Sequence, residues 1–311
     1  MNGPITCPTR RTALAGGLAA AIATWAGGSA RAQFIARAAA GGGELGILSD
    51  GGLTLPVSAA ARGVPEDALT ALLAQAGHSG PTIQSSLNVP VLRRGSEVIL
   101  FDCGGGPNFM ATAGKLPAAM GAAGMDPASV SHVLLTHAHP DHLWGAIDDF
   151  DAPAYANATY HLSQGEWDYW MDPGLFGKLP ETQHAFAAGA QRILKLIEPR
   201  LKRFRPGEEP VTGIAAIDTA GHTPGHVSFE VRGGGDPFVV TGDAITHPIV
   251  SFQRPDWAGG FDRDGEQAAA SRRKLLDRLA TDRLLLSGYH LPNGGLGRAE
   301  RSGPAYRFVP A

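Results

Sequence analysis

Short apolar runs recur along this chain, and many of them are bounded by glycine, proline or charged residues. Runs of this length between turn-forming residues are typical of buried β-strands. They predict strands at residues 133–135, 214–219, 227–231, 238–241 and 284–286. Two further segments predict hairpins, one over residues 44–57 with its turn at Asp50-Gly51-Gly52 and one over residues 90–102 with its turn at 93–96.

Apolar residues spaced three and four apart predict helices between these strands. The helices are expected at residues 64–77, 108–124, 181–198 and 266–280, and a shorter one is expected to follow residue 142. Strands therefore recur first in one half of the chain and then in the other, with helices between them. This order predicts an α/β fold in which two sheets pack face to face and are covered by helices. Neither an internal repeat nor a linker divides the chain, so residues 33–311 are expected to form one domain.

The first 32 residues have the features of an export signal rather than of a folded domain. Arg10 and Arg11 precede a run rich in alanine and glycine, and Ala30-Arg31-Ala32 resembles a cleavage site. The run is short and weakly apolar for a membrane span, although an anchor that stays attached is the alternative interpretation. We therefore expect a twin-arginine signal peptide at residues 1–32 and a periplasmic or secreted protein.

The charge balance gives no indication of a nucleic-acid or membrane partner. The formal net charge is −3, and removal of residues 1–32 would take away three arginines and no acid. A chain of this charge presents no basic face to nucleic acid and is not attracted to anionic membranes. With 43% hydrophobic residues it can bury a substantial core.

A dense group of possible metal ligands follows the strand predicted at residues 133–135. The sequence there is His137-Ala138-His139-Pro140-Asp141-His142. Imidazoles and a carboxylate crowded together repel or desolvate one another unless a cation binds them, and this nitrogen and oxygen ligand set suits zinc. The alternative is a polar loop that is merely rich in histidine.

Three later residues stand in the same relation to a strand. His222, Asp243 and His290 each follow an apolar run, namely those at 214–219, 238–241 and 284–286. Because open α/β sheets place their sites at strand ends, we expect these side chains to converge on the histidine cluster.

The motifs HAHPDH, GHTPGH and TGD, followed by a late histidine, resemble those of the metallo-β-lactamase superfamily, in the variety that binds two metals. The resemblance implies an αββα sandwich and two divalent metal ions. It assigns His137, His139 and His222 to one ion, Asp141, His142 and His290 to the other, and Asp243 to a bridge between them. Zinc is the expected metal, although manganese, iron or cobalt would fit the same ligands.

The chemistry that this resemblance implies is hydrolysis. Two zinc ions about 3.5–4 Å apart share a water molecule, lower its pKa and hold it as a hydroxide nucleophile. Asp141 and Asp243 are then the catalytic carboxylates, and no protein nucleophile is needed. The alternative from a different functional class is a metal-binding protein that has lost its catalytic activity.

Segments outside the metal motifs resemble the exported methyl parathion hydrolase branch of the superfamily. They include residues 48–57, Phe252-Gln253 and the carboxyl terminus from Arg298 to Pro310. The branch implies a homodimer and an aromatic pocket for organophosphate triesters such as methyl parathion, here lined by Phe109, Trp170 and Phe186. Core packing is the alternative interpretation for these aromatic residues. A lactonase, for acyl-homoserine lactones or other lactones, is the alternative function, so the substrate class is a small ester, lactone or phosphotriester.

The remaining candidates are interpreted more simply. His226 is expected to support the site or lie at the surface rather than bind metal, and His247 is expected to be a loop histidine more readily than a site residue. Cys103 is interpreted as a small buried hydrophobic residue. Gly104-Gly105-Gly106 predicts a tight turn close to the metal loop, since it lacks the spacing of a dinucleotide site.

Overall fold

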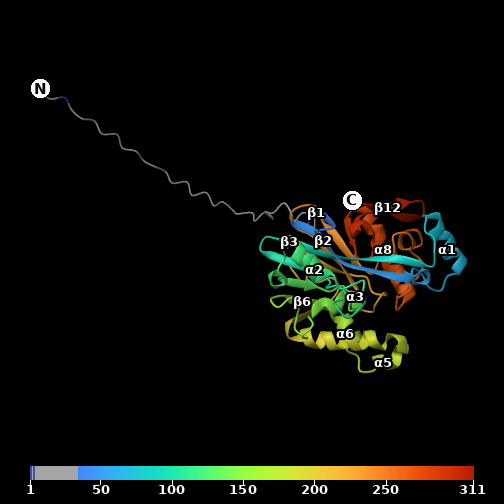
Figure 1. Ribbon diagram of the computed structural model, residues 1–311. Coiled ribbons are helices and arrows are strands. Elements are labelled where there is room, and N and C mark those ends of the chain that lie inside the picture. Colours follow the sequence, from blue (N-terminus) through green and yellow to red (C-terminus); the bar gives the residue numbers. More distant parts are fainter. Residues whose placement is uncertain (2, 4–33) are drawn as a thin grey trace.

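The computed structural model describes Met1, Gly3 and residues 34–311. Apart from Met1 and Gly3, the export signal predicted for residues 1–32 lies outside the described residues. The described strands form two mixed sheets, which are covered by helices (Figure 1). This arrangement confirms the predicted sandwich. Among the described residues, no helix is both long and apolar enough to cross a bilayer.

The first sheet has seven strands in the order of the sequence. Its strands are β1 (Ala36–Ala40), β2 (Gly43–Pro56), β3 (Thr82–Arg94), β4 (Glu97–Phe101), β5 (His132–Leu134), β6 (Thr159–Ser163) and β7 (Leu201–Phe204). The second sheet has six strands in the order β13-β12-β11-β10-β9-β8. Its strands are β8 (Ile214–Asp218), β9 (Val227–Val231), β10 (Phe238–Gly242), β11 (Leu285–Gly288), β12 (Leu296–Ser302) and β13 (Ala305–Pro310).

The helices lie on the outer faces of the two sheets. They are α1 (Glu66–Gln75), α2 (Leu116–Ala122), α3 (Pro140–Leu143), α4 (Gln164–Trp170), α5 (Leu175–Lys178), α6 (His184–Ile197), α7 (Val250–Gln253) and α8 (Gly265–Thr281). In Figure 1, α6 and α8 lie on opposite sides of the strands. The helices predicted at residues 64–77, 181–198 and 266–280 correspond to α1, α6 and α8.

Alternation along the strands produces three apolar layers. In β4, Ile99 and Phe101 face the second sheet, whereas Val98 and Leu100 face the helices of the first. In β10, Phe238 and Val240 join the layer between the sheets, and Val239 packs with Leu276 of α8. Because both faces of these central strands are covered, they read as continuous apolar runs. The same continuity is what made them recognisable in the sequence.

Two predicted elements were wrong, because contacts with distant segments override the local sequence pattern. The hairpin predicted over residues 44–57 is the single strand β2, and its Asp50-Gly51 segment is a β-bulge. The Asp50 carboxylate is buried and accepts hydrogen bonds from the backbone N–H groups of Gly105, Gly114 and Leu116. Gly51 has a φ of 106°, and a Cβ there would lie 2.0 Å from the Thr112 carbonyl oxygen. The residues that resemble a turn therefore fix a neighbouring loop instead.

The helix predicted over residues 108–124 was also wrong in length, because α2 begins only at Leu116. The preceding residues pass through the loop that Asp50 holds. The sequence patterns also missed β1, β6, β7, β12 and β13. β1, β6 and β7 have no more than five residues, β13 lies at a sheet edge, and polar residues interrupt the apolar run of β12 beside it.

Candidate metal centre

The seven predicted ligands come together at one edge of the sandwich. His137, His139, His222 and Asp243 form one cluster, whereas Asp141, His142 and His290 form a second. Within each cluster the ligating atoms lie within 4.8 Å of one another, and all seven side chains are buried. They are carried by segments that directly follow β5, β8, β10 and β11. The grouping is the predicted one, and it arises because strand ends meet at one edge.

Hydrogen bonds fix which nitrogen of four of the histidines faces the cluster. His142 Nδ1 donates to Asp102 Oδ2 at 2.8 Å, and His222 Nδ1 donates to Asp262 Oδ1 at 2.9 Å. His290 Nδ1 donates to the Ser86 carbonyl at 2.9 Å. The Thr136 hydroxyl donates its proton to Asp102. Its oxygen is therefore left as an acceptor, and His137 Nδ1 donates to it at 3.0 Å. With Nδ1 engaged in this way, each of the four rings turns its Nε2 toward the cluster, where that nitrogen can bind a metal once it carries no proton.

These inward-facing nitrogens cannot satisfy one another. His139 Nδ1 lies 3.0 Å from His137 Nε2 and 2.9 Å from His222 Nε2, and once His222 Nε2 has lost its proton the lone pairs of these nitrogens repel unless a cation binds them. His142 Nε2 and Asp243 Oδ1 are buried without a hydrogen-bond partner. Buried polar atoms that lack a partner are expected around a cation. The donor set of imidazole nitrogens and carboxylate oxygens fits a divalent transition metal in each cluster.

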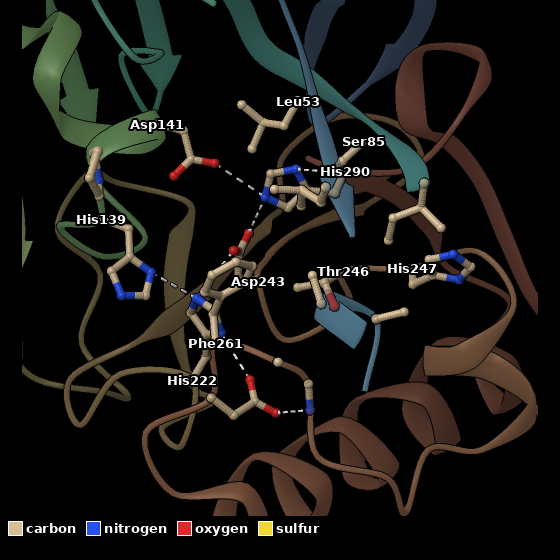
Figure 2. Close-up of a pocket in the computed structure, with 18 of the residues that line it drawn as sticks. Leu53, Ser85, His139, Asp141, His222, Asp243, Thr246, His247, Phe261 and His290 are labelled. Carbon is tan, nitrogen blue, oxygen red and sulfur yellow. Dashed lines mark hydrogen bonds and ion pairs between the residues drawn. The ribbon is translucent and has the colours of Figure 1, made fainter. Parts of the chain in front are cut away.

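Asp243 lies between the two clusters, as Figure 2 shows for its position beside His222 and His290. Its Oδ2 is 3.2 Å from His222 Nε2, whereas its Oδ1 is 3.2 Å from His142 Nε2 and 3.3 Å from His290 Nε2. Each oxygen therefore faces a different cluster. His226, which lies outside both clusters as predicted, holds this residue in place: its Nε2 accepts from the Asp243 backbone N–H at 2.9 Å. Burial lowers the pKa of His226 to about 3, so the ring stays neutral and can accept that bond.

Three buried carboxylates that the sequence patterns did not identify orient the ligand loops. Asp102 accepts from the backbone N–H of Thr136 at 2.7 Å as well as from His142. Asp262 bonds His222 and forms a buried ion pair with Arg272 at 3.0 Å. Such outer partners set the ring orientation and basicity of ligating histidines.

Glu166 is the third, and it joins two ligand loops. Its Oε1 accepts from the Ala138 backbone N–H at 2.9 Å and from Trp170 Nε1 at 2.6 Å. Its Oε2 accepts from the Thr223 hydroxyl at 2.7 Å and from the Gly225 N–H at 3.2 Å. A Cβ on Gly225 would lie 1.9 Å from the Glu166 backbone nitrogen, so this close approach requires glycine. Glu166 thus connects the loop of His137 and His139 to the loop of His222.

The protonation of the histidines follows from burial and from these carboxylates. Burial and the neighbouring histidines lower the pKa of His137 and of His139 well below 6.5, which leaves both rings neutral. Burial also opposes a charge on His222, but Asp243 and Asp262 outweigh it and raise the pKa of His222 to about 9. A metal that takes His222 Nε2 must therefore displace a proton.

A cavity of about 350 Å³ opens above the clusters. His139, Asp141, His222, Asp243 and His290 form its floor. Its wall is largely apolar and includes Leu53, Leu55, Ile83, Phe109, Met110, Phe186 and Phe261. Phe109 and Phe186 meet edge to face with ring centroids 6.2 Å apart. A neutral, lipophilic molecule with one polar reacting group would fit this site.

Two of the three predicted pocket residues line this cavity. Phe109 and Phe186 line the cavity, but Trp170 does not, which corrects that assignment. Trp170 is fully buried, with its ring 5.8 Å from that of His139 and its Nε1 bonded to Glu166. His247 does line the cavity, although its Nδ1 is occupied by the N–H groups of Ile249 and Val250.

Two simpler predictions also match. Gly106 passes so close to the loop after α3 that a Cβ would lie 2.8 Å from the Trp144 carbonyl oxygen, as expected for a tight turn there. Cys103 is buried in the apolar core. Of the three orienting carboxylates, only Asp102 carried a local signal, because it directly follows the apolar strand β4. Nothing local marked Glu166 or Asp262.

Known proteins share this fold. A hydrolase of the β-lactamase superfamily, AbOPH, superposes with a TM-score of 0.82 and 29% identity, covering 88% of this chain and 96% of that one. AidC, a dizinc quorum-quenching lactonase solved with the product N-hexanoyl-L-homoserine, superposes with a TM-score of 0.83 and 27% identity over 89% of this chain and 97% of that one.

Curated sequences are similar over shorter stretches. The N-acyl homoserine lactonase AttM of Agrobacterium fabrum is 36% identical over 133 residues, which is 40% of this chain and 44% of AttM. The protein YobT of Bacillus subtilis is 31% identical over 48% of this chain, and the match spans 63% of its length. The profile of the metallo-β-lactamase superfamily matches residues 85–290. This chain therefore belongs to the metallo-β-lactamase superfamily.

Proposed function

We propose that this protein is a di-metal hydrolase that opens lactone rings, with N-acyl homoserine lactones as the substrate class. The observation that carries the proposal is the position of Asp243, whose two oxygens face separate histidine clusters on the floor of an apolar cavity. A shared carboxylate is the means by which two cations are held close enough to act on one substrate. The apolar wall suits a lipophilic acyl chain.

In this proposal His137, His139 and His222 hold one metal ion, Asp141, His142 and His290 hold the other, and Asp243 binds both. Zinc is the proposed metal, since a set of imidazole nitrogens and carboxylate oxygens suits it. When bound by these residues, two divalent ions would supply Lewis-acid chemistry for the carbonyl under attack and would lower the pKa of a water molecule.

The protein's own side chains carry a proton, hold the catalytic segment in place and exclude water. Asp141 lines the cavity, where its carboxylate can carry a proton from the attacking water to the alcohol released by ring opening. Tyr289 holds that segment, because its hydroxyl donates to the Asp141 carbonyl at 2.6 Å. Phe109 and Phe186 keep water from the acyl side of the substrate.

The neighbours support a lactone more directly than a phosphotriester. AidC and AttM are lactonases by name, and AidC was solved with a ring-opened product. Organophosphate triesters such as methyl parathion are the second candidate, because the edge-to-face pair of Phe109 and Phe186 offers an aromatic surface to an aryl leaving group. We expect the triester to be the slower substrate.

A panel on one metal-replete preparation tests this proposal. N-hexanoyl-L-homoserine lactone, a simple γ-lactone and methyl parathion are compared by kcat/KM, and metal content is measured on the same sample. We expect two equivalents of metal and the highest kcat/KM for a lactone. Faster hydrolysis of methyl parathion would favour the second candidate. A protein that binds both metals but hydrolyses none of the three compounds would support the alternative of a metal-binding protein without catalytic activity.

We also propose export by the twin-arginine route, on the basis of Arg10 and Arg11 and the small residues before Gln33. Replacing both arginines by lysine is expected to leave the protein in the cytoplasm, which cell fractionation measures. Unchanged export of that double variant would contradict the proposed route. The homodimer remains a prediction, to be checked by light scattering.

A further inference from the structure

The cavity contains one full positive charge that the metal clusters do not explain. Among the described residues that line it, Arg263 is the one arginine or lysine. The cavity acids are already engaged: Asp141 and Asp243 belong to the clusters, and Asp262 pairs with Arg272. Within residues 34–311, no carboxylate lies within ion-pair distance of Arg263.

The known contacts of Arg263 are to neutral groups, and one of its donors has none. Its Nη1 donates to the amide oxygen of Gln183, and its charge acts on the nearby Tyr169, where it lowers the pKa of a hydroxyl that burial raises. Its Nε is buried without a hydrogen-bond partner. The backbone N–H of Arg263 donates to the His222 carbonyl at 3.0 Å, which fixes this residue beside the metal floor.

This position is unfavourable for folding alone. A guanidinium near two divalent cations is repelled by them, and a buried N–H without an acceptor loses its hydration without compensation. The rest of the guanidinium lines the cavity, so a ligand that supplies an acceptor there can take a hydrogen bond from it. A lactone whose ring carbonyl lies at the metals and which carries a second carbonyl a few bonds away would supply one.

We propose that Arg263 determines specificity by binding the amide oxygen of an N-acyl lactone. This inference rests on the proposed function and names the amide group as the part of the substrate that the enzyme selects. The ring then lies on the metal floor, the amide lies at Arg263, and the acyl chain runs along Phe109 and Phe186. Lactones without the amide leave the guanidinium unsatisfied and are poorer substrates.

Paired substrates test the role of Arg263 in the metal-loaded, full-length protein. One is N-hexanoyl-L-homoserine lactone, and the other is a γ-butyrolactone with an alkyl chain of equal length on the α-carbon. Arg263→Met is expected to lower kcat/KM for the amide substrate roughly 10- to 100-fold, which is the range for losing a hydrogen bond to a charged group. The alkyl lactone is expected to change by less than about threefold, because it makes no such bond.

Two further measurements separate substrate recognition from a structural defect. Calorimetric binding of the product N-hexanoyl-L-homoserine is expected to weaken roughly tenfold in Arg263→Met, with metal content unchanged. Arg263→Lys keeps the charge without the planar fork and is expected to recover part of the amide preference. Arg307→Met, which removes an exposed arginine paired with Glu300, is the matched control and is expected to behave as wild type.

The inference would be overturned by equal losses on both lactones, by no loss on either, or by unchanged product binding. If Arg263→Met loses metal, the same criteria apply to Arg263→Gln, which is a smaller polar replacement. A wild-type enzyme that opens neither lactone would overturn the proposed function and this inference with it. That result is distinct from a wild type that opens both lactones while the variant shows no selectivity.

Discussion

The floor and the wall of the cavity are built in different ways. In the floor and directly beneath it, four histidines each have their second ring nitrogen fixed by a hydrogen bond, namely His137, His142, His222 and His290, and Glu166 ties two of the ligand loops together. The wall is made of apolar side chains from separate loops, and Met110 and Phe261 are 42% and 49% exposed. The floor is therefore preorganised for one chemistry, whereas the wall can change the substrate without disturbing that chemistry.

The largest effect is expected from removing the residue that both halves of the floor share. Asp243→Ala deletes the two oxygens that face the separate clusters, so we expect kcat/KM to fall roughly 1,000-fold or more. Metal analysis is expected to find fewer than two equivalents. Asp149→Ala, at an exposed aspartate, is the control. A variant that kept two equivalents and full activity would rule out the bridge.

Next in size is the loss of a positioning carboxylate beneath the floor. Glu166→Gln leaves one side-chain oxygen where four donors converge, so Ala138 or Gly225 loses its acceptor. We expect affinity for the metal at His137, His139 and His222 to fall roughly 10- to 100-fold, as measured by competition with a chelator. Glu198→Gln, at an exposed position, is expected to leave affinity unchanged. Equal affinities in both variants would mean that the two loops are held by other contacts.

A wall substitution is expected to separate binding from chemistry. Phe186→Ala removes apolar contact from the substrate but touches no ligand, so KM is expected to rise roughly tenfold with kcat within about twofold. Steady-state kinetics on N-hexanoyl-L-homoserine lactone and metal content check this expectation. Phe150→Ala is the matched control, because Phe150 is 90% exposed and lies outside the cavity lining. A fall in kcat with loss of metal would show that the wall supports the floor.

The smallest effect is expected on the stability of the fold at acid pH, through a residue outside the cavity. It is measured without metal, because acid also releases metal from the ligands. Burial, with a smaller contribution from His132, lowers the pKa of His161 in β6 from 6.5 to about 4. Because the unfolded chain binds the proton more readily, stability is lost as the pH falls from about 6.5 toward 4. The loss is up to about 2 kcal/mol between pH 6.5 and pH 5.

His161→Gln cannot titrate, so its Tm is expected to fall by a few degrees less than that of wild type over this interval. Thermal unfolding of metal-free samples at both pH values measures the difference. Identical slopes for the two proteins would show that His161 does not contribute to acid sensitivity.

Much of the floor was predictable from the sequence for a local reason. Buried strands read as apolar runs, and a ligand placed directly after such a run must lie at a sheet edge. Residues 133–135 before His137 and residues 238–241 before Asp243 show this relation without any knowledge of contacts. The helices α1, α6 and α8 were equally visible, since their apolar spacing is a property of the segment itself.

The sequence by itself thus determined the sandwich, the strand ends and the seven side chains that meet there. The tertiary structure alone decided which acids orient them, since Glu166 and Asp262 find their partners in other segments. It likewise decided that Asp50 anchors a bulge instead of starting a turn, that Trp170 lies beneath His139, and that Arg263 faces the cavity without an acid. The periodicity of a strand or helix is written within a few residues, whereas the partner of a buried polar group is set by chain segments far apart in the sequence.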